Sequence, residues 1–299
     1  MHTTIENKLR SRDDKLFDAA VYIITAVLLI MVGYPLLFVV SASFSNPIDV
    51  VEGRVWLLPE GFTLAPYKQV FENSSIWHGY ANTIFYAVVG TFINLVMTLL
   101  AAYPLSRKDL PGQQFLMFFV TFTMFFSGGL IPTYLLVKSL GITNTVWAML
   151  IPGAIATYNL IVMRSFFQNN IPNELQESAW MDGCTYFRML WSIIIPLSKP
   201  ILAVMVLFYG VGHWNAYFNA LIYLKDRDLF PLQLILREIL ILNQDDMAGG
   251  GAAGMTERVM MAESIKYSVI IVSSVPVMLL YPFIQRYFVK GVMIGSIKG

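Results

Sequence analysis

Long uncharged stretches alternate with short charged segments along this chain. The stretches that lack Asp, Glu, Lys and Arg cover residues 19–48, 73–106, 110–137, 139–163, 200–224 and 267–285. Each provides the roughly 20 residues that an α-helix needs to cross the hydrocarbon core of a bilayer, the last one only barely. The pattern predicts an all-α polytopic membrane protein with six transmembrane helices surrounded by lipid.

Polar residues set the boundaries of the predicted parts. An N-terminal segment, 1–17, precedes a transmembrane domain, 18–290. We place the spans near 19–44, 80–105, 115–137, 144–163, 201–223 and 267–285, with a polar insert at 164–199, an external loop at 225–266 and a tail at 291–299.

Helix-breaking residues interrupt two of the spans. Ser127–Gly129 lies within the third span and Pro152–Gly153 within the fourth. Such breaks are tolerated in a bundle when neighbouring groups satisfy the backbone. They either line a path or allow close helix packing. In the external loop, helical spacing of apolar residues predicts a short helix over Leu232–Leu242.

Composition agrees with a membrane protein. The chain is 57% hydrophobic and 13% charged, whereas soluble chains carry about 25% charged residues. Its net charge of +1, without a basic patch among aromatics, predicts no nucleic-acid partner. The single cysteine, Cys184, excludes an internal disulfide and cannot form a cysteine metal site alone, so no metal site is predicted.

Lysine and arginine placement predicts the orientation. With six spans, 12 of the 20 basic residues fall on the side that holds the N-terminal cluster and the polar insert. The positive-inside rule then puts both termini in the cytoplasm. The external loop 225–266 opposes this, because it holds Lys225, Arg227, Arg237, Arg258 and Lys266.

The polar insert holds the most informative motif. Asn173 is placed to cap a helix, with Gln176 three residues later as in a variant capping box. Gly183 supplies a left-handed stop. The predicted helix is about ten residues long, roughly 15 Å. Small side chains on one face would let another surface approach closely.

These residues resemble the "EAA" signature of ABC importer permeases, which is Glu-Ala-Ala, three residues, Gly, nine residues and Ile-x-Leu-Pro. The matching positions here are Glu177, Ser178, Ala179, Gly183, Ile193, Ile195 and Pro196. Ser178 and Ile195 are conservative departures, and every spacing holds. An ordinary amphipathic helix on the membrane surface is the alternative interpretation.

The resemblance extends over nearly the whole chain. Ala101–Arg107 and the C-terminal 286–299 are similar to the carbohydrate-uptake permeases of the maltose-permease type. This resemblance implies the type I ABC importer architecture in a bacterial cell membrane. It also implies a sister permease, two ATP-binding subunits and an extracellular solute-binding protein as partners.

The resemblance also implies roles for single residues. The polar insert becomes a cytoplasmic coupling helix that contacts the ATPase through Glu177, Ser178, Ala179, Asp182 and Gly183. In the tail, Lys290, Gly295 and Lys298 become candidate ATPase contacts, with a frayed terminus as an equal alternative.

The spans contain little that could harvest an ion gradient. Carriers coupled to ions need buried charged groups near the midplane, and here only His213 lies within a span. A histidine next to Trp214 is more often a hydrogen-bonded packing residue. The chain also lacks the loop that binds nucleotide phosphates. We therefore expect no cofactor and no catalytic residue in this chain, and ATP and Mg²⁺ bound by partner subunits.

The fifth span carries a candidate substrate path. Aromatic faces and amides suit a sugar, and the candidates are Trp214, Asn215, Tyr217 and Asn219, with Tyr158 and Asn159 in the fourth span. An aromatic belt at the membrane interface explains the fifth-span residues equally well.

The sequence therefore predicts a permease subunit of an ATP-driven, binding-protein-dependent carbohydrate importer that works by alternating access. A permease of the same superfamily for another solute, such as a peptide or a phosphonate, is the first alternative. A membrane-embedded enzyme is the second, and it would need a catalytic constellation that the histidines at 2, 78 and 213 do not form.

Overall fold

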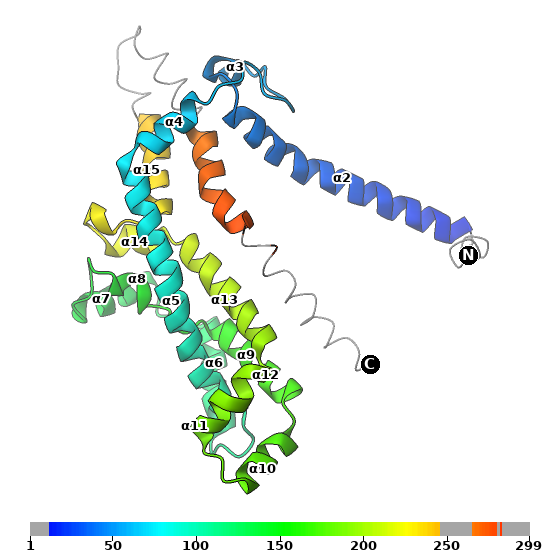
Figure 1. The fold of residues 1–299 in the computed structure, drawn as a ribbon, viewed down its shortest axis with the longest axis vertical. Coiled ribbons are helices and arrows are strands. Elements are labelled where there is room, and N and C mark those ends of the chain that lie inside the picture. The colour runs from blue at the N-terminus through cyan, green and yellow to red at the C-terminus, as the bar shows by residue number, and fades with distance from the viewer. Residues whose placement is uncertain (1–11, 246–264, 280–281, 283–299) are drawn as a thin grey trace. The chain divides into compact units, whose positions relative to one another are not determined.

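The computed structural model describes residues 12–245, 265–279 and 282, and none of these lies in a β-strand. The labelled elements, drawn in Figure 1, are α2 (Arg12–Ser43), α3 (Pro47–Val51), α4 (Ala65–Glu72), α5 (Ser74–Ser106), α6 (Gln113–Phe125), α7 (Leu130–Ser139), α8 (Trp147–Leu150), α9 (Thr157–Asn170), α10 (Asn173–Met181), α11 (Tyr186–Met189), the π-turn η1 (Leu190–Ile194), α12 (Ile195–Leu197), α13 (Lys199–Trp214), α14 (Phe218–Tyr223), the 3₁₀ turn η2 (Arg227–Leu229) and α15 (Leu232–Asp245). A further apolar helix covers Ile265–Leu279. The all-helical prediction is confirmed for the described residues.

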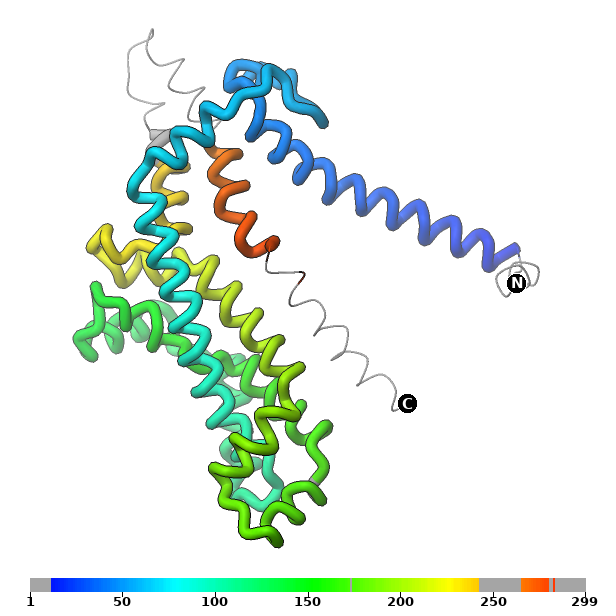
Figure 2. The backbone as a smooth tube through the Cα atoms, in the orientation of Figure 1, coloured from blue at the N-terminus to red at the C-terminus, as the bar shows by residue number. Residues whose placement is uncertain are grey.

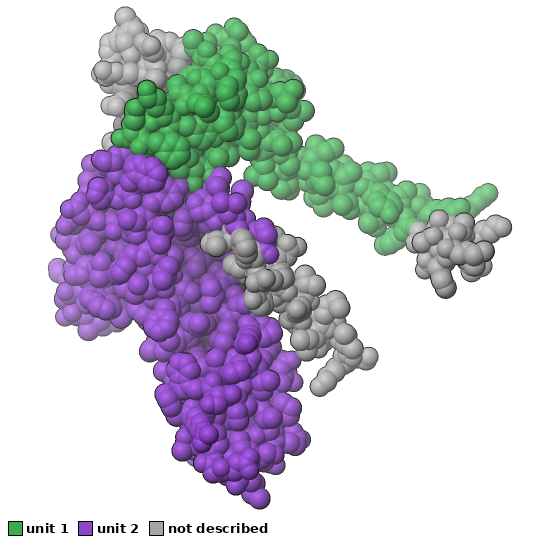
Figure 3. Space-filling view, viewed as in Figure 1, with its two compact units in different colours: residues 1–72, 240–272 green, residues 73–239, 273–299 purple. Residues whose placement is uncertain are grey.

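The chain divides into two compact units, coloured separately in Figure 3. Unit 1 comprises residues 1–72 and 240–272, and unit 2 comprises residues 73–239 and 273–299. The predicted polar insert and most of the predicted spans fall in unit 2.

In unit 1, the C-terminal end of α2 is the part that packs. Ala42 is fully buried together with Val50 and Val55, and Phe38 and Tyr267 pack against them. The Tyr67 hydroxyl donates to Ser43 Oγ at 2.8 Å. The rest of α2 is apolar and exposed, and none of its most apolar window is buried within the chain. Lipid or another protein chain must cover such a surface.

In unit 2, α5 is the central helix. Asn73 caps its start by accepting a hydrogen bond from the Ser75 amide. The helix then runs for 33 residues to Ser106, with Pro104 only in its last turn. Helices α13 and α9 pack along it, and their side chains form the largest buried cluster of the unit. The predicted second span is therefore confirmed as a helix, although it begins at Ser74 rather than near 80.

The predicted breaks lie where the sequence places them. Helix α6 ends at Phe125 and α7 begins at Leu130, and the two axes differ by 113°. The stretch between α8 and α9 contains Gly153 with φ +80°. Figure 2 shows the backbone path through both breaks. A further break, which the sequence did not reveal, separates α13 from α14 at residues 215–217.

Asn94 satisfies the backbone at the break before α9. Its Nδ2 donates to the carbonyl oxygens of Gly153 and Ala154 at 3.1 and 2.9 Å. Its Oδ1 lies 2.7 Å from His213 Nε2 on α13, which donates in this arrangement. A Cβ at Gly90 would collide with the same imidazole ring. His213 is thus a hydrogen-bonded packing residue, as the sequence predicts.

Tyr209 fixes the other end of the same break. Its hydroxyl accepts from the Ala156 amide at 3.2 Å and lies 2.7 Å from Thr98 Oγ1. Side chains from α5 and α13 therefore replace the backbone hydrogen bonds that the broken helix lacks.

Two described helices, α2 and α5, are long and apolar enough to cross a membrane. The number rises to four if α6 with α7, and Tyr186–Leu197 with α13, each count as one span. The helix Ile265–Leu279 is shorter and also apolar. The prediction of six spans thus stays a prediction.

We predict that Asn94→Ala lowers the stability of the folded chain by about 1–3 kcal/mol, because two backbone carbonyls at the break and one imidazole lose the partner that the buried Asn94 side chain supplies. Thermal unfolding of the purified protein in detergent measures this. Asn215→Ala is the matched control, since Asn215 is exposed and its amide bonds only to Val211 in the preceding turn. Equal midpoints for the two variants would contradict the role given to Asn94.

Candidate functional site

Helix α10 is the element predicted from the polar insert, and it forms over Asn173–Met181. It starts at Asn173, the residue predicted to cap it, so the observed N-cap lies one residue earlier than predicted. Pro172 occupies the N-cap in an extended conformation, without a side-chain cap, so the capping-box prediction is wrong. The fixed φ of proline suits this junction, so the helix begins directly after it.

The predicted stop at Gly183 is confirmed. Gly183 has φ +70°, its amide donates to the Trp180 carbonyl, and the Cys184 amide donates to the Ala179 carbonyl. These two bonds form a Schellman motif, which closes the helix and satisfies its last carbonyls.

Four of the five predicted coupling residues lie on the surface. Glu177, Ser178, Asp182 and Gly183 are exposed, whereas Ala179 is 7% exposed and packs in the main cluster of unit 2. The neighbouring Met181 is 89% exposed. The helix therefore rests on the bundle through its small residue, and its exposed surface combines polar side chains with the apolar Leu175, Trp180 and Met181.

Arg107, directly after α5, contacts both flanks of this helix stop. Its guanidinium carbon lies 4.5 Å from the centre of the Trp180 ring and 4.9 Å from that of Tyr186. The two rings meet edge to face at 6.0 Å. The side chain of Arg107 is only 7% exposed. A desolvated guanidinium over aromatic rings is a favourable arrangement. We call Arg107, Trp180 and Tyr186, with Tyr103 and Asp109, the arginine box.

Asp109 and Tyr103 complete the box. The guanidinium donates to both carboxylate oxygens of Asp109, at 2.9 and 2.6 Å, and to the Tyr103 hydroxyl at 3.4 Å. These bonds lower the pKa of the Asp109 carboxyl below its ordinary value. A lowered pKa keeps the carboxylate charged at neutral pH, and the pair would be lost only in acid, below the ordinary range of an aspartate.

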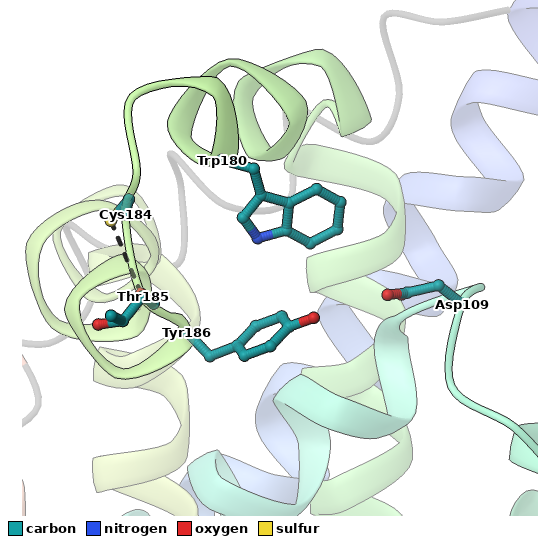
Figure 4. A pocket seen from close by; sticks show the side chains of 5 residues that line it. All are labelled: Asp109, Trp180, Cys184, Thr185 and Tyr186. Atoms are coloured by element: carbon teal, nitrogen blue, oxygen red, sulfur yellow. Dashed lines mark hydrogen bonds between the residues drawn. The ribbon is translucent and has the colours of Figure 1, made fainter.

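A hollow of about 470 Å³ opens beside the box. It is lined by Asp109, Trp180, Cys184, Thr185 and Tyr186. Figure 4 shows the Trp180 and Tyr186 rings on two sides and Asp109 facing them. Cys184 is the only cysteine of the chain and is partly exposed here.

The end of α5 that carries Arg107 is itself held by side chains. Gln113 and Arg164 both donate to the Leu105 carbonyl, at 2.8 and 2.9 Å, and Gln168 donates to the Ser106 carbonyl. The last carbonyls of a helix have no partners within it, and these bonds supply them. Arg107 is therefore fixed relative to α5, α6 and α9.

The chain after the box leads back into the bundle. Tyr186–Leu197 forms a helix with a π-turn at Leu190–Ile194, and it meets α13 at 83°. Pro196 lacks an amide hydrogen, which agrees with the irregular bonding just before it. Met189 and Ile194 are fully buried. The second half of the predicted polar insert thus contains the largely apolar helix Tyr186–Leu197, which packs in the bundle through Met189 and Ile194.

The predicted substrate-path residues differ in exposure. Trp214 is 7% exposed, and its indole donates to the Ser273 carbonyl at 3.1 Å. Asn159 is also 7% exposed. The other four, which are Tyr158, Asn215, Tyr217 and Asn219, are exposed. Arg237 lies beside one of them, with its guanidinium carbon 5.9 Å from the Tyr217 ring centre.

The remaining predicted site residues are not described by the structure. Lys290, Gly295 and Lys298 lie outside the described residues. Within the described residues, no three His, Cys, Asp or Glu side chains are placed to hold a metal ion.

Sequence reasoning missed the part that Arg107 plays. The sequence analysis used Arg107 as a basic residue for the orientation and as the last residue of the stretch Ala101–Arg107 that resembles the permease family. It predicted no contact for this side chain. The signal that could have found it is an arginine just after an apolar helix, together with Trp180 and Tyr186 on either side of a glycine stop.

The comparisons with known proteins agree with this architecture. Residues 94–294 match the family of binding-protein-dependent transport system inner membrane components. Because the match covers more than half of the chain, the chain belongs to this family of ABC transport permeases.

Individual relatives are similar over nearly their full lengths. The chain is 42% identical to the polygalacturonan/rhamnogalacturonan transport system permease protein YtcP of Bacillus subtilis, over 96% of this chain and 99% of that protein. It is also 42% identical to protein LplC of the same organism, over 89% of each chain. A solved bacterial ABC transporter involved in import of the acidic polysaccharide alginate contains a chain with TM-score 0.84 and 31% identity, over 94% of this chain and 99% of that one.

We predict that Gly183→Val loosens the end of α10 and that Gly183→Asn does so much less. No atom lies within 4 Å of a Cβ built at Gly183, so the cost arises from the left-handed backbone alone. That cost is about 1–2 kcal/mol for an ordinary residue and smaller for Asn. The rate of maleimide labelling at the adjacent Cys184 reports the change. Equal rates for both variants would contradict the Schellman assignment.

Proposed function

We propose that this chain is one permease subunit of an ATP-driven importer and that α10 is its coupling helix, on the cytoplasmic side. The observation that carries the proposal is the exposure of Glu177, Ser178 and Asp182 on a helix that is closed at Gly183 and seated through Ala179. A partner subunit could press on such a surface without entering the bundle.

We further propose the assembly and topology that the resemblance implies. The chain crosses a bacterial cell membrane six times with both termini in the cytoplasm. It pairs with a sister permease, two ATP-binding subunits and an extracellular solute-binding protein. ATP and Mg²⁺ bind to the ATPase subunits, and this chain performs no covalent chemistry. The exposed apolar surface of α2 supports a partner chain or lipid around it.

We propose an acidic oligosaccharide as the transported solute. Two relatives support this: one is named for polygalacturonan and rhamnogalacturonan transport, and one structure is described for alginate import. In this chain, Arg237 lies next to the exposed Tyr217. The neighbouring carboxylate of Glu238 already has a cationic partner, because it forms an ion pair with Arg227 at 2.9 Å. A guanidinium beside an aromatic face can bind a carboxylate on a sugar ring.

If α10 is a cytoplasmic coupling helix, Cys184 should react with an impermeant reagent only from the cytoplasmic side of the membrane. A membrane-impermeant maleimide should label Cys184 in inside-out vesicles and not in intact cells, and bound ATPase subunits should slow the labelling. For the control, Cys184→Ser combined with Leu58→Cys places the thiol between the first and second predicted spans, on the predicted outer side, where Leu58 is 77% exposed. That variant should label from outside only. Labelling of Cys184 from outside would overturn the orientation.

The solute proposal predicts a charge preference in uptake. Cells should accumulate a galacturonate oligomer, and excess neutral glucose oligomer of equal length should not compete. Arg237→Gln should raise the apparent KM for the acidic solute roughly tenfold, the scale of one charge-assisted contact. Arg227→Gln is the control, because its charge is already paired. Equal competition by the neutral oligomer would exclude an acidic preference.

A further inference from the structure

Of the described side chains in α10, only that of Ala179 is buried. The helix therefore has little direct packing on the bundle. The Trp180 ring of this helix also contacts the Arg107 guanidinium at 4.5 Å. These contacts therefore offer a direct route by which a displacement of α10 can reach the bundle.

Arg107 touches both sides of the helix stop at once. Trp180 precedes Gly183 and Tyr186 follows it, and the guanidinium lies within 5 Å of both ring centres. The chain from Tyr186 bends into α13. Arg107 itself belongs to the end of α5. The same cation thus contacts α10, the segment that leads to α13, and α5.

The position of Arg107 is fixed by other groups in the bundle. Asp109 binds the guanidinium through two oxygens, and the Tyr103 hydroxyl accepts a further bond. Gln113, Arg164 and Gln168 hold the carbonyls of the preceding turn. A side chain fixed in this way moves with α5 and is not free to relax when α10 is pushed.

We propose that Arg107 is the positioning residue that joins the coupling helix to α5, so that movement of α10 reaches the transmembrane bundle through this guanidinium. The inference rests on the proposed function. The planar guanidinium is required, because it stacks on two rings while its edge binds the carboxylate. A lysine ammonium keeps the charge but cannot meet both conditions.

The test uses Arg107→Lys in the complete transporter with its natural partners, reconstituted in vesicles with the loaded solute-binding protein. We expect the ATPase subunits to co-purify as before, since the exposed residues of α10 are unchanged. Uptake should fall roughly tenfold, and ATP hydrolysed per solute imported should rise by about the same factor, the scale of losing a buried guanidinium contact. Arg227→Lys is the matched control, with a 72% exposed side chain in an ion pair.

Two further variants separate coupling from folding. Trp180→Phe keeps an aromatic face and should retain uptake within about threefold, whereas Trp180→Leu should match Arg107→Lys. If Arg107→Lys does not yield a monodisperse complex, the Trp180 variants decide the question. Unchanged ATP consumption per solute in Arg107→Lys, or equal behaviour of Trp180→Phe and Trp180→Leu, would overturn the inference. If the wild-type chain does not co-purify with any ATPase, the proposed function itself fails.

Discussion

Backbone groups without a partner are the constraint on which this structure depends. An apolar bundle offers no water to a helix that breaks or ends inside it. Asn94 and Tyr209 supply the missing bonds at the break before α9. Gln113, Arg164 and Gln168 supply them at the end of α5. With those bonds in place, unit 2 can contain broken helices and still hold a defined geometry.

The geometry around α10 and the arginine box follows from the same constraint. Because the end of α5 is fixed by side chains, Arg107 emerges in one position and can be enclosed by Trp180, Tyr186 and Asp109. The Schellman motif at Gly183 turns the chain so that both aromatic rings reach the guanidinium. Helix α10, in which Ala179 is the one buried residue among the described side chains, is thereby attached to the bundle, while its polar residues stay exposed.

Sequence patterns predicted the elements that depend on local chemistry. The long apolar stretch of α5, the breaks at Ser127–Gly129 and Pro152–Gly153, and the stop at Gly183 were all predicted, because proline, glycine and hydrophobicity act over a few residues. The helix over Leu232–Leu242 was predicted too, as the first part of α15.

Contacts between distant residues could not be predicted in this way. The burial of Trp214 and Asn159 depends on neighbours far along the chain, and so does the arginine box. The break after α13 at residues 215–217 contains neither proline nor glycine, so no local signal marks it. The helix Tyr186–Leu197 lies within the predicted polar insert, 164–199, and the burial of its Met189 and Ile194 depends on the surrounding bundle. Tertiary packing determines the burial of Trp214 and Asn159, the arginine box and the break after α13.

We propose that this chain harvests no energy itself and is driven through α10 by a separate ATPase. The most direct measurement is solute accumulation in proteoliposomes that contain either the purified chain alone, under an imposed proton or sodium gradient, or the complete complex with ATP on the cytoplasmic side. We predict accumulation only in the complete complex and only with ATP. Accumulation by the chain alone, driven by the ion gradient, would contradict it.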